Sequence, residues 1–174
     1  MNLTAIRHII RGVLLLLLQV LVLKRIGLGE SWIWEYGNIF IYPVIIFLLP
    51  FRLSRLYVIL IGFFIGLIID IFYDTIGVHA FALTATAYAR GLMLTYMEPR
   101  GGYQLSMSPT LFSMGLNWVL TFTFFAMLIH VFLYFSVEIF TFVYIGQILL
   151  KTLITLVLSM LVIMGYHLLF NPRT

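Results

Sequence analysis

Residues 56–72 read LYVILIGFFIGLIIDIF, and Asp70 is the only charged residue in this run. A helix needs roughly 20 mostly apolar residues to cross the hydrocarbon core of a bilayer, and this run approaches that length. Its near-continuous apolar character, without a polar face, is typical of a helix surrounded by lipid and other helices. The stretch therefore predicts a membrane-spanning helix.

The composition of the whole chain agrees with this prediction. Of its 174 residues, 63% are hydrophobic and 9% are charged, whereas soluble domains have about 45–50% apolar and about 25% charged residues. A water-soluble fold of this length cannot bury so much apolar surface. We expect a single transmembrane domain over residues 1–174, with no separate soluble domain.

Further apolar runs predict an all-α integral membrane bundle of six transmembrane helices. We expect these spans at about 8–28, 38–51, 56–72, 77–97, 111–135 and 139–170, with an interfacial loop at 29–36 and a polar loop at 98–109. The second run is short and contains Pro43 and Pro50, which predicts a kinked, tilted helix or an incomplete crossing. Dividing the last run at Lys151 would give seven spans, which fits the charge distribution less well.

The charges at the ends of the runs predict the orientation. With six spans, one side of the membrane carries six basic residues and the other only Lys24 and Arg25; the six are Arg7, Arg11, Arg52, Arg55, Arg100 and Arg173. Cytoplasmic loops are enriched in lysine and arginine. The pattern therefore predicts a multi-pass protein with both termini in the cytoplasm.

Several classes of function are disfavoured by the sequence. The chain has no cysteine, which excludes disulfides and thiol chemistry. It has no HExxH, no glycine-rich phosphate loop and no nucleophile elbow, so we expect neither an enzyme nor a bound cofactor. The net charge of +4 comes from bases at the ends of spans, and we expect no nucleic-acid partner.

Two basic residues are expected near the middle of the membrane, Arg90 and Lys151. A charge in hydrocarbon is costly, so each indicates a polar cavity or ion path, or else snorkelling to the membrane surface or a structural pair with Asp70, Asn117 or Gln147. Snorkelling or a structural pair is the favoured interpretation. A proton path would place histidines through the bilayer, but all four are expected near span ends; they are His8, His79, His130 and His167.

Two acidic residues, Asp70 and Asp74, lie with His79 where the third expected span ends and the fourth begins. The two carboxylates are four residues apart and would share one face if the helix continued. A divalent metal could bind there. A solvated helix end followed by a turn explains the same residues, and this interpretation is favoured.

Small residues give the clearest packing signal. Gly62 and Gly66 form a GxxxG pair, and Ala82, Ala85 and Ala89 form a stripe on the next span. Small residues let helix backbones approach closely in lipid. These positions predict close packing within the bundle or, as the alternative, a face for a partner helix.

The order of motifs between Tyr42 and Arg90 resembles the rod shape-determining protein MreD family. The stretch reads YPVIIFLLPFRLSR, then IGFFIGLIID, then GVHAFALTATAYAR. The family combines a proline and an arginine after the second span with a glycine-rich third span ending in aspartate. The matching positions are Pro50, Arg52, Gly62, Gly66, Asp70, Gly77 and Ala82.

The resemblance implies a non-enzymatic scaffold of the peptidoglycan-synthesising elongation machinery, which determines rod shape in the bacterial inner membrane. It further implies MreC as a binding partner, with MreB, RodA and a penicillin-binding transpeptidase in the same complex. Arg52, Arg55 and the 98–109 loop would face cytoplasmic components. The family is similar in fold to the S components of energy-coupling-factor transporters. A substrate-binding S component of a vitamin-type transporter is therefore the alternative function, and an ion or lipid carrier is a third.

Overall fold

The chain is described here from a computed structural model, which covers residues 3–26, 36–105 and 107–170. Within these ranges every regular element is a helix and none is a strand, which confirms the all-α prediction there. Four helices are long and apolar enough to cross a membrane: Ile6–Ile26, Arg55–Tyr73, Leu116–Ile139 and Ile145–Phe170. The predicted loop at 29–36, apart from Tyr36, and Arg173 lie outside the described residues.

The N-terminal helix is continuous but changes its winding. The α-helix α1 (Leu3–Leu17) passes through a π-helical stretch, η1 (Leu18–Leu23), into α2 (Lys24–Ile26). Such π-helical turns are rare and often coincide with functional positions. Here the turn contains Gln19, whose side chain is fully buried in the bundle.

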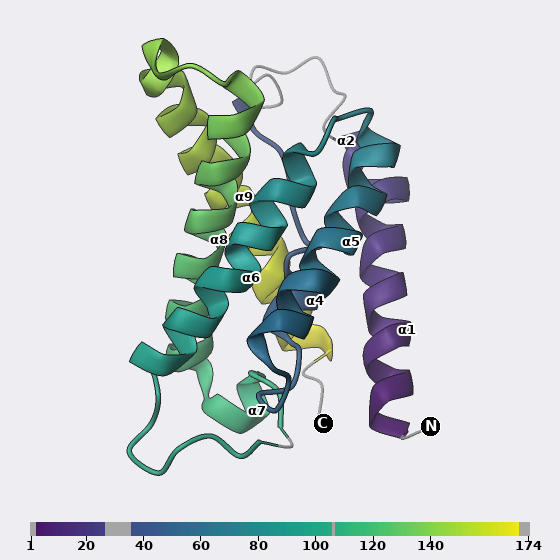
Figure 1. Ribbon diagram of the computed structural model, residues 1–174, viewed down its shortest axis with the longest axis vertical. Coiled ribbons are helices and arrows are strands. Elements are labelled where there is room, and N and C mark those ends of the chain that lie inside the picture. The colour runs from purple at the N-terminus through teal and green to yellow at the C-terminus, as the bar shows by residue number, and fades with distance from the viewer. Residues whose placement is uncertain (1–2, 27–35, 106, 171–174) are drawn as a thin grey trace.

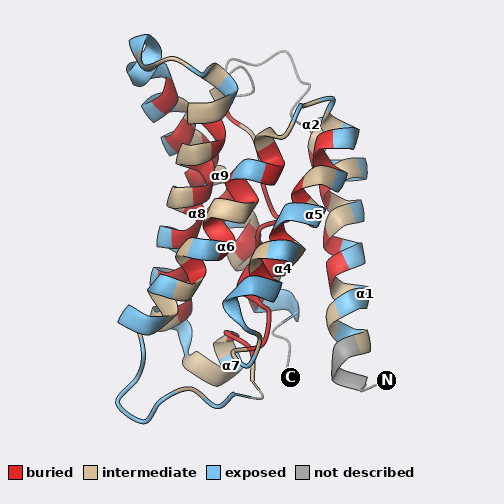
Figure 2. Ribbon diagram, viewed as in Figure 1, coloured by how far each residue is buried: buried red, intermediate tan, exposed pale blue. Residues whose placement is uncertain are grey.

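Residues 37–50, called the central segment below, pass through the middle of the bundle (Figure 1). The first part is not helical, and only Val44–Phe47 forms a short helix, α4. Residues 40–50 are buried without exception, as Figure 2 shows. A kinked, tilted helix, one of the two forms expected over 38–51, is thus replaced by non-helical backbone followed by a single helical turn.

The next two helices form a tight hairpin. Helix α5 (Arg55–Tyr73) ends at Asp74, which has a left-handed backbone with φ 56°, and α6 (Val78–Tyr96) begins after Gly77, with φ 79°. Glycine adopts such angles at no steric cost, and aspartate tolerates them better than most residues. The chain can therefore reverse within four residues.

The remaining elements complete the bundle. The short helix α7 (Leu111–Met114) leads into α8 (Leu116–Ile139), and a 3-10 turn, η2 (Phe142–Tyr144), leads into α9 (Ile145–Phe170). Helix α6 packs between α5 and α8, and α8 packs against α9.

Many large apolar side chains point outward, among them Phe64, Ile71, Leu153 and Val157. This outward apolar surface suits a lipid surrounding.

The charges separate between the two ends of the bundle. Helix α7 and the described ends of α1 and α9 lie together at one end (Figure 1). We call this the basic end, because it carries Arg7, Arg11, Arg52, Arg55 and Arg100. The opposite end carries Lys24 and Arg25 with the exposed acids Asp74 and Glu138.

Candidate functional site

Gly62 and Gly66 lie in the contact between α5 and α6. A Cβ atom on Gly66 would come within 2.4 Å of the Ala80 Cα atom, and one on Gly62 within 3.1 Å of the Leu83 carbonyl oxygen. Both glycines are buried. The GxxxG pair therefore packs α5 against α6, which is the interpretation that the sequence favoured.

The alanine stripe divides between two environments. Ala82 is fully buried in the core, whereas Ala85 and Ala89 are only half-buried. Ala85 lines an apolar groove of about 530 Å³ between α5 and α6 on the outside of the bundle. Its other lining residues include Ala80 and Thr84 on α6 and Phe63 on α5.

Asp70 is a buried hydrogen-bond acceptor that joins the two helices of the hairpin. Its carboxylate accepts from the backbone N–H groups of His79 and Ala80, both at 2.9 Å, and from the Thr75 hydroxyl at 2.5 Å. It therefore satisfies free N–H groups at the start of α6, where the helix dipole also favours a negative charge. Asp74 is exposed, and the described residues contain no group of three side chains placed to bind a metal.

The hydroxyl of Tyr42 in the central segment connects two buried histidines. It lies 2.9 Å from His79 Nδ1 and 2.6 Å from His130 Nε2. His130 lies nine residues before the end of α8 and is fully buried in the core. Sequence reasoning missed this contact, since the three residues come from three distant parts of the chain.

The hydrogen bonds assign the proton positions in this network. The Thr86 hydroxyl donates to the Ala82 carbonyl oxygen at 2.7 Å, so it accepts from His130 Nδ1 at 3.1 Å. His130 Nε2 then accepts from Tyr42, and the Tyr42 oxygen accepts from His79 Nδ1. With both imidazoles neutral, each hydroxyl and each imidazole donates one hydrogen bond, so every contact in this network has one donor and one acceptor. The network holds the central segment between α6 and α8.

Side chains also satisfy the backbone of the non-helical part of the central segment. The Asn38 and Phe40 N–H groups donate to the hydroxyls of Thr155 and Ser159, at 3.0 and 2.9 Å. Gln19 accepts from the Ile41 N–H at 2.8 Å and donates to the Ile39 carbonyl oxygen at 2.9 Å. Non-helical backbone inside a membrane protein requires such partners.

Two arginines donate hydrogen bonds to the C-terminal end of the central segment. Arg11 of α1 donates to the Leu48 carbonyl oxygen at 3.1 Å, and Arg90 of α6 donates to the Leu49 carbonyl oxygen at 2.5 Å. Both carbonyls follow helix α4, at the end where a helix dipole favours cations. Arg90 is therefore structural in part, with a backbone partner in place of the acidic or amide partners considered from the sequence.

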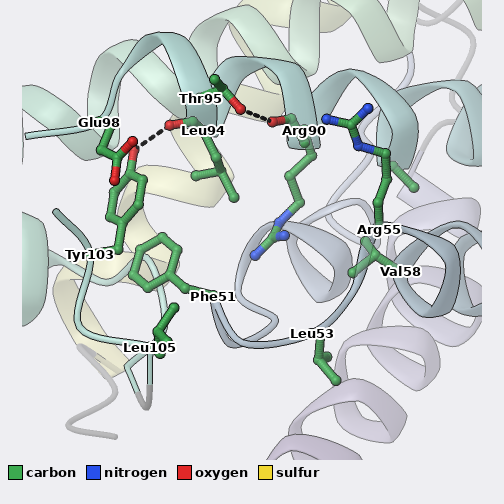
Figure 3. A pocket seen from close by; sticks show the side chains of 12 residues that line it. Phe51, Leu53, Arg55, Val58, Arg90, Leu94, Thr95, Glu98, Tyr103 and Leu105 are labelled. Atoms are coloured by element: carbon green, nitrogen blue, oxygen red, sulfur yellow. Dashed lines mark hydrogen bonds between the residues drawn. The ribbon is translucent and has the colours of Figure 1, made fainter.

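A pocket of about 270 Å³ opens beside Arg90 at the basic end (Figure 3). Its walls are α5, α6, the loop after α6 and the turn before α5; they include Arg55, Glu98, Tyr103, Phe51 and Leu53. The Arg90 side chain is 3% exposed and its Nε has no hydrogen-bond partner. Burial, and next the nearby Glu98 carboxylate, raise the pKa of Tyr103 to about 12, so the phenol is neutral at physiological pH.

The other predicted charged positions are simpler. The Lys151 ammonium lies 3.7 Å from the Glu138 carboxylate, in an ion pair that ties α9 to α8 near the opposite end. Snorkelling or a structural pair was the favoured interpretation, and the pair that forms has a partner, Glu138, that was not among those considered. Arg52 and Arg55 are both exposed at the basic end.

Comparison of the chain with known protein families, with curated proteins and with solved structures finds no match. The residues and their geometry therefore carry the functional argument.

Proposed function

We propose that the protein is a non-enzymatic scaffold of the inner-membrane cell-elongation machinery, as its resemblance to the MreD family implies. In this proposal it binds the single membrane-spanning helix of MreC, beside MreB, RodA and a penicillin-binding transpeptidase. The observation that carries the proposal is the apolar groove between α5 and α6. Its floor of small side chains lets a helix approach closely, which is how helices associate in lipid.

The proposed topology has six crossings and both termini in the cytoplasm. Helices α1 to α2, α5, α6, α8 and α9 supply five crossings, and the central segment supplies the sixth. The arginines of the basic end would then face the cytoplasm, in agreement with the positive-inside rule. Arg52, Arg55 and the loop after α6 would be accessible to cytoplasmic components.

The groove is suited to a partner because most of its lining side chains are not buried in the bundle. Gly62 and Gly66 already contact α6, so their substitution would disturb the hairpin whether or not a partner exists. Ala85 and Thr84, in contrast, face the open groove, which Phe63, Phe81 and Tyr88 border. An apolar partner helix would gain contact with these rings, which otherwise contact lipid.

The alternative function, a vitamin-binding S component, draws support from the broken central segment. Discontinuous spans often line the binding sites of transporters. The interior near Asp70 and His130 is filled, however. The Phe40 ring lies 4.9 Å from the Tyr134 ring and 5.8 Å from the Tyr42 ring, between centroids. Lys151, which could otherwise contribute to such a pocket, pairs with Glu138. This packing favours the scaffold.

The test is a bulky substitution in the groove. Ala85→Phe should fill the groove and reduce co-purification with MreC, while the protein still inserts and stays monodisperse in detergent. Val157→Phe on α9, at an exposed position, is the matched control and should bind MreC at the wild-type level. Cells that depend on the Ala85→Phe protein should lose rod shape. Wild-type MreC binding by this variant would disprove the groove as the partner site. A small molecule co-purifying in stoichiometric amount would instead support the S component.

A further inference from the structure

The pocket beside Arg90 contains a buried positive charge that no acid of the described residues balances. The described ion pairs leave Arg90 and Arg55 without a carboxylate partner. Arg90 is 3% exposed, its Nε is unpaired, and its one hydrogen bond is to the Leu49 carbonyl oxygen. A buried charge without a counter-charge is costly, and membrane proteins tolerate such groups where they meet an ion or ligand.

The second arginine is held at the same pocket by its surroundings. Arg55 lies over the Tyr88 ring, with Cζ 5.4 Å from the ring centroid. Its Nε occupies the space that a side chain on Gly91 would need, because a Cβ there would come within 2.7 Å of that nitrogen. A lysine has no planar group to lie flat in this way. The glycine and the tyrosine thus fix Arg55 at the wall of the pocket.

The remaining polar groups of the pocket do not cancel this charge. Figure 3 shows the Glu98 carboxylate beside the Tyr103 hydroxyl, with the Phe51 ring between them and the Arg90 guanidinium. Phe51 and Tyr103 are stacked, with centroids 4.3 Å apart. The neutral Tyr103 hydroxyl donates to the Leu94 carbonyl oxygen at 2.9 Å. The side of the pocket that holds both arginines is therefore positive.

We infer that this pocket binds a phosphate group, with Arg90 and Arg55 as the cationic side chains of its wall. Guanidinium groups match phosphate oxygens with paired, charge-assisted hydrogen bonds. The first turn of α5, which contributes Arg55 and Val58 to the wall, adds the positive end of a helix dipole. The phosphate would come from the headgroup of an anionic lipid or from a soluble phosphate compound. This inference does not depend on the partner groove.

The test uses the full-length protein in nanodiscs and two probes. The first probe is phosphatidylglycerol in a phosphatidylcholine bilayer, measured as lipid retained on the protein by native mass spectrometry. The second is inorganic phosphate added to phosphatidylcholine nanodiscs, measured by isothermal titration calorimetry. Binding of phosphatidylglycerol alone identifies the ligand as a lipid headgroup. Binding of inorganic phosphate identifies it as a soluble phosphate compound.

Three variants decide the outcome. Arg55→Gln should weaken binding of the effective probe about tenfold, the usual effect of losing one hydrogen bond to a charged group. Arg52→Gln removes an equally exposed charge from the same end but not from the pocket, and should leave binding unchanged. Arg90→Lys keeps the charge and should retain part of the affinity. If Arg55→Gln and Arg52→Gln behave alike with both probes, the inference is wrong, because only general surface charge is then involved.

Discussion

The two ends of the bundle use their polar residues differently. Toward the opposite end, the Asp70 carboxylate has three donors, and Gln19 pairs with the Ile39 carbonyl oxygen and the Ile41 N–H of the central segment. At the basic end, Arg90 Nε, Ser108 Oγ and both ring nitrogens of His167 are buried without partners, whereas toward the opposite end the described residues leave His79 Nε2 and Thr152 Oγ1 unpaired. A fully paired polar group stabilises a unique fold, whereas an unpaired one raises the energy of the folded state or awaits a ligand. The opposite end thus mainly fixes the structure, and the basic end, which holds the unpaired nitrogen of a charged arginine, is where binding chemistry is expected.

The largest effect should come from the closest helix contact. Gly66→Ala would place a methyl group 2.4 Å from the Ala80 Cα and 2.7 Å from its nitrogen, both backbone atoms that cannot move alone. We expect a loss of about 3 kcal/mol in the free energy of unfolding, measured by reversible unfolding in mixed SDS micelles. Gly146→Ala meets no atom within 4 Å and is the control. Equal stability of the two variants would show that α5 and α6 are less tightly packed than described.

The second effect tests the carboxylate that joins α5 to α6. Asp70→Asn removes the charge and one acceptor oxygen from three donors, and should cost about 2 kcal/mol of unfolding free energy. Asp74→Asn is the matched control, since Asp74 is exposed and asparagine accepts its left-handed backbone. Circular dichroism during the same unfolding experiment measures the unfolding free energy of both variants. A similar small loss for each would mean that Asp70 does not anchor the start of α6.

The membrane character of the fold could be predicted from the sequence because it depends only on composition and on the length of apolar runs. The packing role of Gly62 and Gly66 could also be predicted, because their spacing is visible within one short stretch of the sequence. The form of the central segment could not. Pro43 and Pro50 indicate that a regular helix fails there, but they do not say what replaces it.

The site depends on residues that are distant in the chain. Thr155 and Ser159 lie four residues apart on one face of α9. This spacing indicates a polar face, which was not among the predictions from the sequence. Their partners, the N–H groups of residues 38 and 40, become visible only when the central segment is placed. The partner of Lys151 was missed likewise, because the turn between α8 and α9 brings Glu138 to it.

A smaller effect of opposite sign is expected at the basic end. His167 is 1% exposed and neither ring nitrogen has a partner, so His167→Leu should raise the free energy of unfolding by about 1 kcal/mol. His130→Leu is the comparison, because it would leave Tyr42 and Thr86 unpaired and should destabilise the protein. The same unfolding experiment gives both values. Destabilisation by His167→Leu would indicate that the histidine binds a partner, and the contrast between the ends would weaken.

The smallest effect concerns the phenol that borders the phosphate pocket. The pKa of Tyr103 is raised to about 12 by burial and then by Glu98, above its ordinary value of about 10. The folded protein therefore holds this proton more tightly than the unfolded chain, so its contribution to stability is complete below about pH 10 and is lost as the pH rises toward 12. Ultraviolet difference titration of the wild type against Tyr103→Phe isolates this one phenol. A step near pH 10 would mean that Tyr103 is exposed to water and that Glu98 does not act on it. The pocket would then be wider than described, and Arg90 less shielded from the solvent.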